Sequence, residues 1–233
     1  MDKFCIVKTI NLFRSHKFSI PMTSAPSLAA YLSPIPLVAI LRGIQTHECQ
    51  AIVDVLYESG LRCIEIPLNS PDAIRSIEVL AKTMPADCLL GAGTVLTLGA
   101  LNDVANAGGK LIVMPHCDPE LITHSAASGL YSIPGVATVS EAFSALKHGA
   151  NALKLFPADS VSPTALKNWR TVLPKETICL PVGGISPDNM EAYFQVGANG
   201  FGLGAALYQA GMSAEQVKHN AQRFIANLPH TRN

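Results

Sequence analysis

The chain has 233 residues, of which 48% are hydrophobic and 15% are charged, and its formal net charge at pH 7 is zero. This balance is typical of a globular protein with one large core, and it excludes disorder for most of the chain. It also disfavours nucleic acid or an anionic membrane surface as a partner of the whole molecule. Because Gly or Pro interrupts the most apolar stretches within about ten residues, none is long enough to span a membrane.

Residues 1–35 differ in composition from the rest of the chain. Four of them are basic and one is acidic. We expect an N-terminal extension over residues 1–35, poorly ordered or partly helical, followed by one domain over residues 36–233. An organellar leader is the alternative for this basic segment, although it holds few arginines and little serine.

The six cysteines are scattered and form no CxxC pair. Most of them lie among apolar residues, which is typical of reduced thiols in the core of a cytoplasmic protein. The cytoplasm is therefore the expected location.

Eight short apolar runs alternate with eight longer amphipathic segments from residue 37 onward. The predicted strands cover residues 37–42, 63–68, 89–95, 111–115, 130–134, 152–156, 178–182 and 200–203. The predicted helices cover residues 45–59, 71–83, 98–107, 119–128, 139–148, 163–172, 187–196 and 214–228. Strict alternation implies parallel strands joined by right-handed crossovers, and eight such units in about 200 residues predict an α/β fold of the (β/α)8 TIM-barrel type.

A doubly wound open sheet is the alternative fold. It would be expected to carry a glycine-rich dinucleotide turn after its first strand, where this chain has Arg42, Gly43 and Ile44.

Turn residues also mark the predicted helices. Starts with a capping residue before proline occur at Ser70–Pro71, Asp118–Pro119, Ser162–Pro163 and Ser186–Pro187, and glycine ends occur at Gly60, Gly108, Gly129, Gly149 and Gly197.

Polar side chains interrupt four of the predicted strands. Arg42 ends the first, Glu65 lies in the second, Thr94 closes the third and Lys154 lies in the sixth. Chemistry in TIM barrels collects at the carboxyl ends of the strands, where such residues would meet. Alternation of side chains predicts that Glu65, Lys154 and Phe156 face the barrel interior, and it also places Ala92 inward with Thr94.

Lys154 is the most informative of these residues. Burial disfavours the ammonium form, so the pKa falls and an amine becomes available to attack a carbonyl carbon. Glu65 would then move protons during formation and breakdown of a carbinolamine. The alternative is a structural ion pair between the two side chains. Arg42 offers a fork that suits a substrate carboxylate, although it could equally cap a strand end against an acid.

A second candidate site is built from glycines. Val182 ends a predicted strand before Gly183 and Gly184, and further glycines follow in the last strand up to Gly204. The loops after strands seven and eight of barrels often bind phosphate through backbone amides, so these residues predict a phosphate site. The alternative is that the glycines serve tight turns only.

The adjacent His116, Cys117 and Asp118 would point apart in an extended chain, so we expect no metal site there.

Five motifs carry a family resemblance. They are Leu37–Gly43 (LVAILRG), Glu65–Pro71 (EIPLNSP), Gly91–Val95 (GAGTV), Leu153–Pro157 (LKLFP) and Val182–Ile185 (VGGI). The chain resembles, over about residues 36–228, the family of 2-dehydro-3-deoxy-6-phosphogluconate and 4-hydroxy-2-oxoglutarate aldolases, and within it the members that act on 2-dehydro-3-deoxy-6-phosphogalactonate. The resemblance implies a class I aldolase that releases pyruvate and D-glyceraldehyde 3-phosphate, needs no metal or other cofactor and assembles as a homotrimer.

The resemblance also implies roles for individual residues. Lys154 would form the Schiff base, and Glu65 would move protons. Arg42 and Thr94 would hold the carboxylate, Pro115 and Phe156 would wall the pyruvyl pocket, and Gly183, Gly184 and Gly204 would receive the phosphate. Asn69 and Val182 follow the galactonate pattern and would contact the distal part of the substrate.

The chain departs from the family pattern in two places. Met114, Pro115 and His116 stand where relatives often have Thr-Pro-Asn, and Ala205 replaces a serine near the phosphate. Three alternatives stay open: an aldolase for the gluconate or hydroxyglutarate substrates, a phosphosugar epimerase or isomerase, and a non-catalytic barrel that binds a phosphorylated sugar acid.

Overall fold

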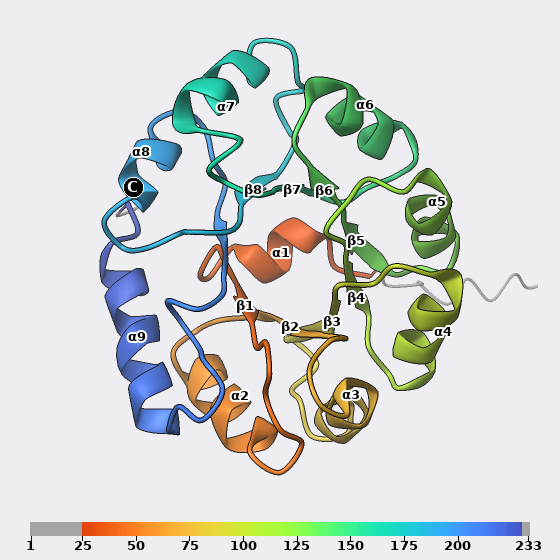
Figure 1. Cartoon of the computed structure of the whole chain (residues 1–233), viewed down its shortest axis with the longest axis vertical. Helices are drawn as coiled ribbons and strands as arrows, with labels where there is room; N and C mark the ends of the chain where they lie inside the picture. The colour runs from red at the N-terminus through yellow and green to blue at the C-terminus, as the bar shows by residue number, and fades with distance from the viewer. Residues whose placement is uncertain (1–24, 230–233) are drawn as a thin grey trace, which may run out of the picture.

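The computed structural model describes residues 25–229, so residues 1–24 of the predicted extension lie outside the described part. A short helix, α1 (Leu28–Leu32), precedes alternating strands and helices (Figure 1). The strands are β1 (Leu37–Ile40), β2 (Cys63–Pro67), β3 (Leu89–Gly93), β4 (Leu111–Val113), β5 (Tyr131–Ile133), β6 (Gly135–Val136), β7 (Leu153–Leu155), β8 (Cys179–Pro181) and β9 (Phe201–Leu203). The helices that follow are α2 (Cys49–Glu58), α3 (Ala73–Ala81), α4 (Leu98–Asn106), α5 (Pro119–Ala127), α6 (Val139–Lys147), α7 (Pro163–Trp169), α8 (Met190–Phe194) and α9 (Ala214–Ala226).

All strand pairs are parallel, as the alternation predicts. One sheet runs in the order β5-β4-β3-β2-β1-β9 and the other in the order β6-β7-β8. The two sheets meet where Val182, after β8, pairs with Gly202 of β9. They meet again at Pro134, which separates β5 from β6. The strands therefore close into a barrel, with the helices from α2 to α9 around it (Figure 1), and the predicted TIM-barrel fold is confirmed.

The predicted strand over residues 130–134 corresponds to β5, and a further short strand that the sequence analysis did not predict, β6, follows it. Proline has no backbone N–H, so the ladder from β4 ends at Pro134, and the chain continues beside β7 as β6. Gly135 is required there, because a Cβ atom on it would lie 2.4 Å from the carbonyl carbon of Pro115. The loop after β4 thus rests directly on the strand that neighbours Lys154.

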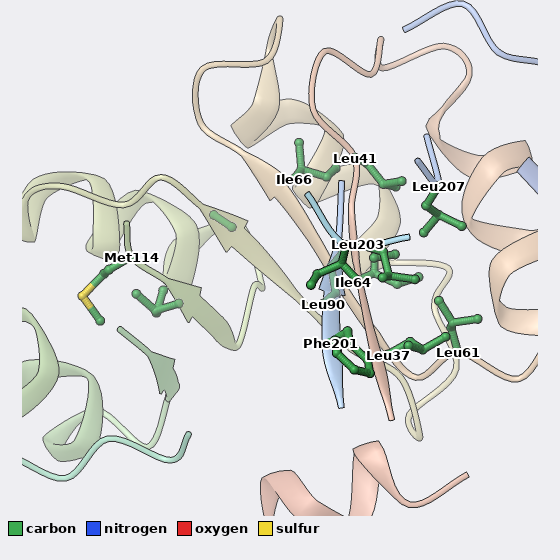
Figure 2. Close-up of a cluster of buried hydrophobic side chains, with 14 of the residues drawn as sticks. Leu37, Leu41, Leu61, Ile64, Ile66, Leu90, Met114, Phe201, Leu203 and Leu207 are labelled. Carbon is green, nitrogen blue, oxygen red and sulfur yellow. The ribbon is translucent and has the colours of Figure 1, made fainter. Parts of the chain in front are cut away.

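The core has an outer and an inner part. Between strands and helices lie outward-facing side chains such as Ile64, Ile66 and Leu90, seen with Leu37 and Phe201 in Figure 2. The inner part fills the barrel and joins residues of α1 to inward-facing residues of the strands. Its buried members are Leu28, Leu32, Val38, Cys63, Leu89, Leu111, Val113, Tyr131, Ile133, Ala152 and Leu180. Helix α1 therefore plugs one end of the barrel.

Side-chain alternation in β2 and β7 is as predicted, but the prediction for β3 is wrong. Ala92 packs in the outer part of the core with Leu90, whereas Leu89 lies in the inner part. Gly91 and Gly93 take the remaining inward positions, and a hydrophobicity pattern gives no weight to glycine. Thr94 follows the strand with a φ of +57°, where regular alternation has ended.

Most helix ends match the turn residues, with two exceptions. Asp118 and Ser162 cap α5 and α7 before a proline, and Gly60, Gly108, Gly129, Gly149 and Gly197 all have positive φ after a helix. However, α3 begins at Ala73 and α8 at Met190, later than Pro71 and Pro187. Within residues 25–229 no helix has the length and apolar character needed to cross a membrane.

Candidate active site

Lys154 lies in the middle of β7 and is 6% exposed. Its neighbours Leu153 and Leu155 pack outward against the helices, which turns the lysine into the barrel. Burial lowers the pKa of its ammonium group, the negative charge of Glu65 opposes this effect, and the positive charge of Arg42 reinforces it. The Nζ atom lies 4.6 Å from the ring centroid of Phe156. A buried amine with a lowered pKa is suited to nucleophilic attack.

Glu65 lies in β2 and is 1% exposed. Burial raises the pKa of its carboxyl group to about 7, against the smaller lowering effects of Lys154 and Arg42. Its Oε2 atom is buried without a hydrogen-bond partner in the structure. Among the ion pairs of residues 25–229 none joins Lys154 to a carboxylate, Glu65 included. The two groups share the barrel interior without direct pairing, and the carboxyl group of Glu65, with its pKa of about 7, could take up or release a proton near neutral pH.

Gly93 makes room for the Glu65 carboxylate. A Cβ atom at position 93 would lie 2.0 Å from Oε2 and 2.4 Å from Cδ of Glu65. These distances are far below van der Waals contact, so only glycine fits beside the carboxylate in its present place. The spacing of Gly91 and Gly93 within a predicted strand is the sequence signal for this close approach.

Apolar side chains surround the two titratable groups on the inner side. Val38, Ile40, Val113, Ile133, Leu180 and Val182 line a cavity of about 10 Å³ together with Glu65 and Lys154. Val182 is 6% exposed, and its methyl groups lie where a side chain on Gly202 would otherwise stand. These walls keep bulk water from the lysine and account for the direction of both pKa shifts.

Arg42 follows β1 at the carboxyl end of the barrel and is exposed. Its Nη1 atom donates a hydrogen bond of 2.7 Å to Oδ1 of Asn69, in the loop after β2. Next to this contact, the backbone N–H of Gly43 donates to Oγ of Ser70 at 2.9 Å. Ser70, predicted as a helix cap, therefore joins two loops instead. The alternative role of Arg42 as a cap against an acid finds no such acid among the described ion pairs.

Phe156, Pro115 and Thr94 lie at the ends of their strands and are half-buried. Phe156 contacts Lys154, and its ring lies 3.5 Å from the position that a Cβ atom on Gly183 would take. Pro115 rests on Gly135, whose register partner is Lys154. The structure thus places the Phe156 ring between Lys154 and the Gly183 loop, and Pro115 against the neighbouring strand β6.

The glycine loop follows β8. Gly183 and Gly184 have φ values of +96° and +72°, which a side chain would strain. Asn189 fixes the loop, because its Nδ2 donates to the carbonyl of Gly184 at 2.8 Å and its Oδ1 accepts from the amide of Ser186 at 3.0 Å. Helix α8 begins only at Met190, so a phosphate here would meet loop amides rather than a helix N-terminus. Gly204, after β9, is half-buried with open space beside its Cα.

His116 and Asp118 approach each other without a third ligand nearby. His116 Nε2 lies 3.8 Å from Asp118 Oδ2, while the Cys117 thiol turns to the carbonyl of Glu141. Asp118 also caps α5 with its other carboxylate oxygen. Nowhere in residues 25–229 do three or more His, Cys, Asp or Glu side chains gather in a way that could hold a metal ion.

Comparison with known proteins identifies the family to which the chain belongs. Residues 28–223 match the family model for KDPG and KHG aldolase. The chain belongs to this family of aldolases. A relative in Rhizobium meliloti (strain 1021), "Probable 2-dehydro-3-deoxy-6-phosphogalactonate aldolase", is 46% identical over 193 residues, which cover 83% of this chain and 90% of that protein.

Two solved structures extend the likeness to three dimensions. A structure titled "Native KDPGal structure" has a TM-score of 0.81 and 39% identity, and the match covers 83% of this chain and 94% of that one. A KDPG aldolase from Legionella pneumophila, with pyruvate captured as a covalent carbinolamine intermediate, has a TM-score of 0.72 and 30% identity over 85% of this chain and 94% of that chain.

Proposed function

We propose that the protein is a class I aldolase that cleaves 2-dehydro-3-deoxy-6-phospho-D-galactonate to pyruvate and D-glyceraldehyde 3-phosphate. The observation that carries the proposal is a lysine with a lowered pKa, buried in the barrel beside a carboxyl group whose pKa is raised to about 7. Membership of the aldolase family supports it, and the pyruvate carbinolamine captured in the Legionella pneumophila relative supports the covalent route.

The first step joins Lys154 to the substrate. The neutral amine attacks the C2 carbonyl carbon, and the oxygen takes a proton to give a carbinolamine. Loss of water leaves a protonated imine, with Glu65 giving and receiving the protons that these steps require. A carboxyl group with a pKa of about 7 is present in both protonation states at neutral pH, so it can do both.

The second step breaks the bond between C3 and C4. A base removes the proton of the C4 hydroxyl, the C3–C4 electron pair moves toward the cationic imine nitrogen, and the aldehyde departs. The remaining enamine is protonated at C3, and water then releases pyruvate and restores the amine of Lys154. The apolar walls of the cavity strengthen the effect of each charge on these reaction steps.

The remaining predicted contacts place the substrate around Lys154. Arg42 and Thr94 bind the carboxylate at the rim, and Pro115 and Phe156 enclose the pyruvyl group. The amides of Gly183 and Gly184, with the open position at Gly204, receive the phosphate. Ala205 supplies no hydroxyl, so these backbone amides carry that contact.

The galactonate substrate is proposed over its C4 epimer because Val182 faces the interior without a hydroxyl. A single polar contact is worth about 1–3 kcal/mol where an unpaired buried group is the alternative. We expect the galacto epimer to be cleaved with a kcat/KM at least about tenfold higher than the gluco epimer. The Val182→Thr variant should narrow this gap.

The assay follows pyruvate release from both phosphorylated epimers under one set of conditions. Equal or inverted preference would contradict the galactonate assignment and favour the gluconate aldolase. Absence of pyruvate release from either epimer, and from 4-hydroxy-2-oxoglutarate, would instead favour a phosphosugar isomerase or a non-catalytic barrel.

We further propose that the protein is a cytoplasmic homotrimer that needs no metal, as the family resemblance implies. Sedimentation equilibrium would give the mass of three chains, and cleavage would keep its rate in excess chelator. A monomer mass would contradict the assembly, and activity that is lost in chelator and restored by a divalent ion would contradict metal independence.

A further inference from the structure

We propose that Asn69 is a positioning residue for Arg42, whose guanidinium it holds at the barrel mouth in the place that receives the carboxylate of pyruvate. The inference rests on the proposed function, because it assumes that Arg42 binds this carboxylate. It assigns Asn69 to the pyruvyl end of the substrate, whereas the sequence resemblance implied a contact with the distal end.

In the hydrogen bond between Arg42 and Asn69, only Arg42 can be the donor. Arginine carries only donors, so its Nη1 can meet Asn69 only through the amide oxygen, as the 2.7 Å distance between Nη1 and Oδ1 shows. The amide acceptor is neutral. A carboxylate at position 69 would cancel part of the positive charge of Arg42, whereas an amide fixes the side chain and leaves its charge for a ligand.

The backbone around Asn69 is fixed on both sides. The N–H of Ser70 donates to the carbonyl of Pro67 at 2.8 Å, and the N–H of Leu68 donates to the carbonyl of Gly93 at 2.8 Å. Ser70 is 8% exposed, and its Oγ accepts the N–H of Gly43, the residue after Arg42. The turn that carries Asn69 is thereby tied to the loop that carries Arg42, so the amide presents a constant position to the guanidinium.

Arg42 needs such a partner because it is exposed and long. A free arginine side chain populates many rotamers, and binding a carboxylate would then have to order it. Holding the side chain in one rotamer should therefore improve binding of the carboxylate rather than change the chemistry that follows.

Pyruvate separates the two possible roles of Asn69, because it has the carboxylate and the ketone but none of the distal hydroxyls or the phosphate. The experiment measures borohydride trapping of pyruvate on Lys154 as a function of pyruvate concentration. The proteins compared are the wild type, Asn69→Ala, Arg42→Ala and the double variant. Asn102→Ala is the matched control, since it removes an exposed contact of the same kind, to His124 on a neighbouring helix.

We expect Asn69→Ala to raise the half-saturating pyruvate concentration roughly three- to tenfold, the range of one lost hydrogen bond, with the trapping rate at saturation unchanged. The double variant should behave as Arg42→Ala alone, because Asn69 acts through Arg42. Asn102→Ala should match the wild type.

Two results would overturn the inference while leaving the aldolase in place. One is an unchanged pyruvate curve for Asn69→Ala, with loss only on the phosphorylated substrate, which would show direct contact with the distal end. The other is a further loss in the double variant equal to that of Asn69→Ala alone. Failure of the wild type to trap pyruvate at all would instead contradict the proposed function and remove the premise.

Discussion

Glu65, the proposed proton shuttle, lowers the stability of the folded chain at neutral pH. Its pKa rises from 4.5 to about 7 on burial, and hydrogen bonding does not satisfy its Oε2. Between these two pH values the folded chain keeps a proton that the unfolded chain releases. The free energy of unfolding therefore falls as the pH rises from about 4.5 to about 7, because the unfolded state is stabilised by releasing a proton that the folded state still holds.

Glu65→Gln tests this account, since glutamine has a similar shape and no charge. We expect the variant to be more stable than the wild type at about pH 8, by roughly 1–3 kcal/mol, and equally stable near pH 4.5. Cleavage should fall by about two orders of magnitude or more, as expected for loss of a proton shuttle. Urea unfolding at both pH values checks the first point, and an activity assay checks the second. A variant that is less stable at both pH values would contradict the assignment.

Gly93→Ala tests the space that holds the Glu65 carboxylate. The added methyl group would meet Oε2 at 2.0 Å, so the carboxylate has to leave its place. We expect the cleavage rate to fall at least about tenfold and its dependence on pH to change, because the proton shuttle has moved. Gly99→Ala, whose new Cβ meets its nearest atom at 3.9 Å, is the control and should keep full activity. Wild-type rates and an unchanged pH profile in Gly93→Ala would contradict the role of this glycine.

At the scale of elements, helix α1 closes one end of the barrel. Leu28 and Leu32 are 3% and 5% exposed and belong to the inner part of the core. Tyr31 packs edge-to-face on Tyr131 with ring centroids 5.7 Å apart, and the Tyr131 hydroxyl donates to the carbonyl of Pro26. The helix precedes β1 in the sequence and supplies none of the predicted site residues.

The Leu32→Ala variant should therefore lose stability but keep its activity. We expect the free energy of unfolding to fall by about 2–4 kcal/mol, because a buried leucine leaves a cavity. The KM and kcat of the folded variant should match the wild type. Val172→Ala, at a side chain that is 55% exposed, should cost less than about 0.5 kcal/mol. A changed KM in Leu32→Ala would show that α1 also shapes the substrate site.

The strands and helices also show how much of the fold can be predicted from the sequence. Alternating hydrophobic runs and the glycine helix ends located every strand of the barrel except β6, and helices α2 to α9, because burial dominates those segments. Strand β6, which packs against Pro115, was not predicted, and Ser70 made a contact between loops instead of capping α3. Both outcomes depend on residues far apart in sequence, Pro115 and Gly43, and no local pattern holds that information.

At the scale of the whole molecule, the barrel turns residues from separate motifs into one candidate site. Arg42, Glu65 and Lys154 come from β1, β2 and β7 or the loops that follow them, and parallel strands bring their carboxyl ends to one side of the barrel. Side-chain alternation predicted that Glu65 and Lys154 share the interior. It could not predict Gly93 or the partner of Asn69, because these depend on side-chain positions across neighbouring strands and loops.

The central claim is that Lys154 is the imine-forming lysine. The measurement is incubation with pyruvate and borohydride, followed by peptide mass analysis to locate the modified residue. Lys154 is buried with a lowered pKa, whereas the other lysines of residues 25–229 are exposed or half-buried. We expect the reduced pyruvyl group on Lys154 alone, and neither adduct nor cleavage in Lys154→Ala, while Lys110→Ala behaves as the wild type. An unmodified Lys154, or cleavage that survives in Lys154→Ala, would contradict the account.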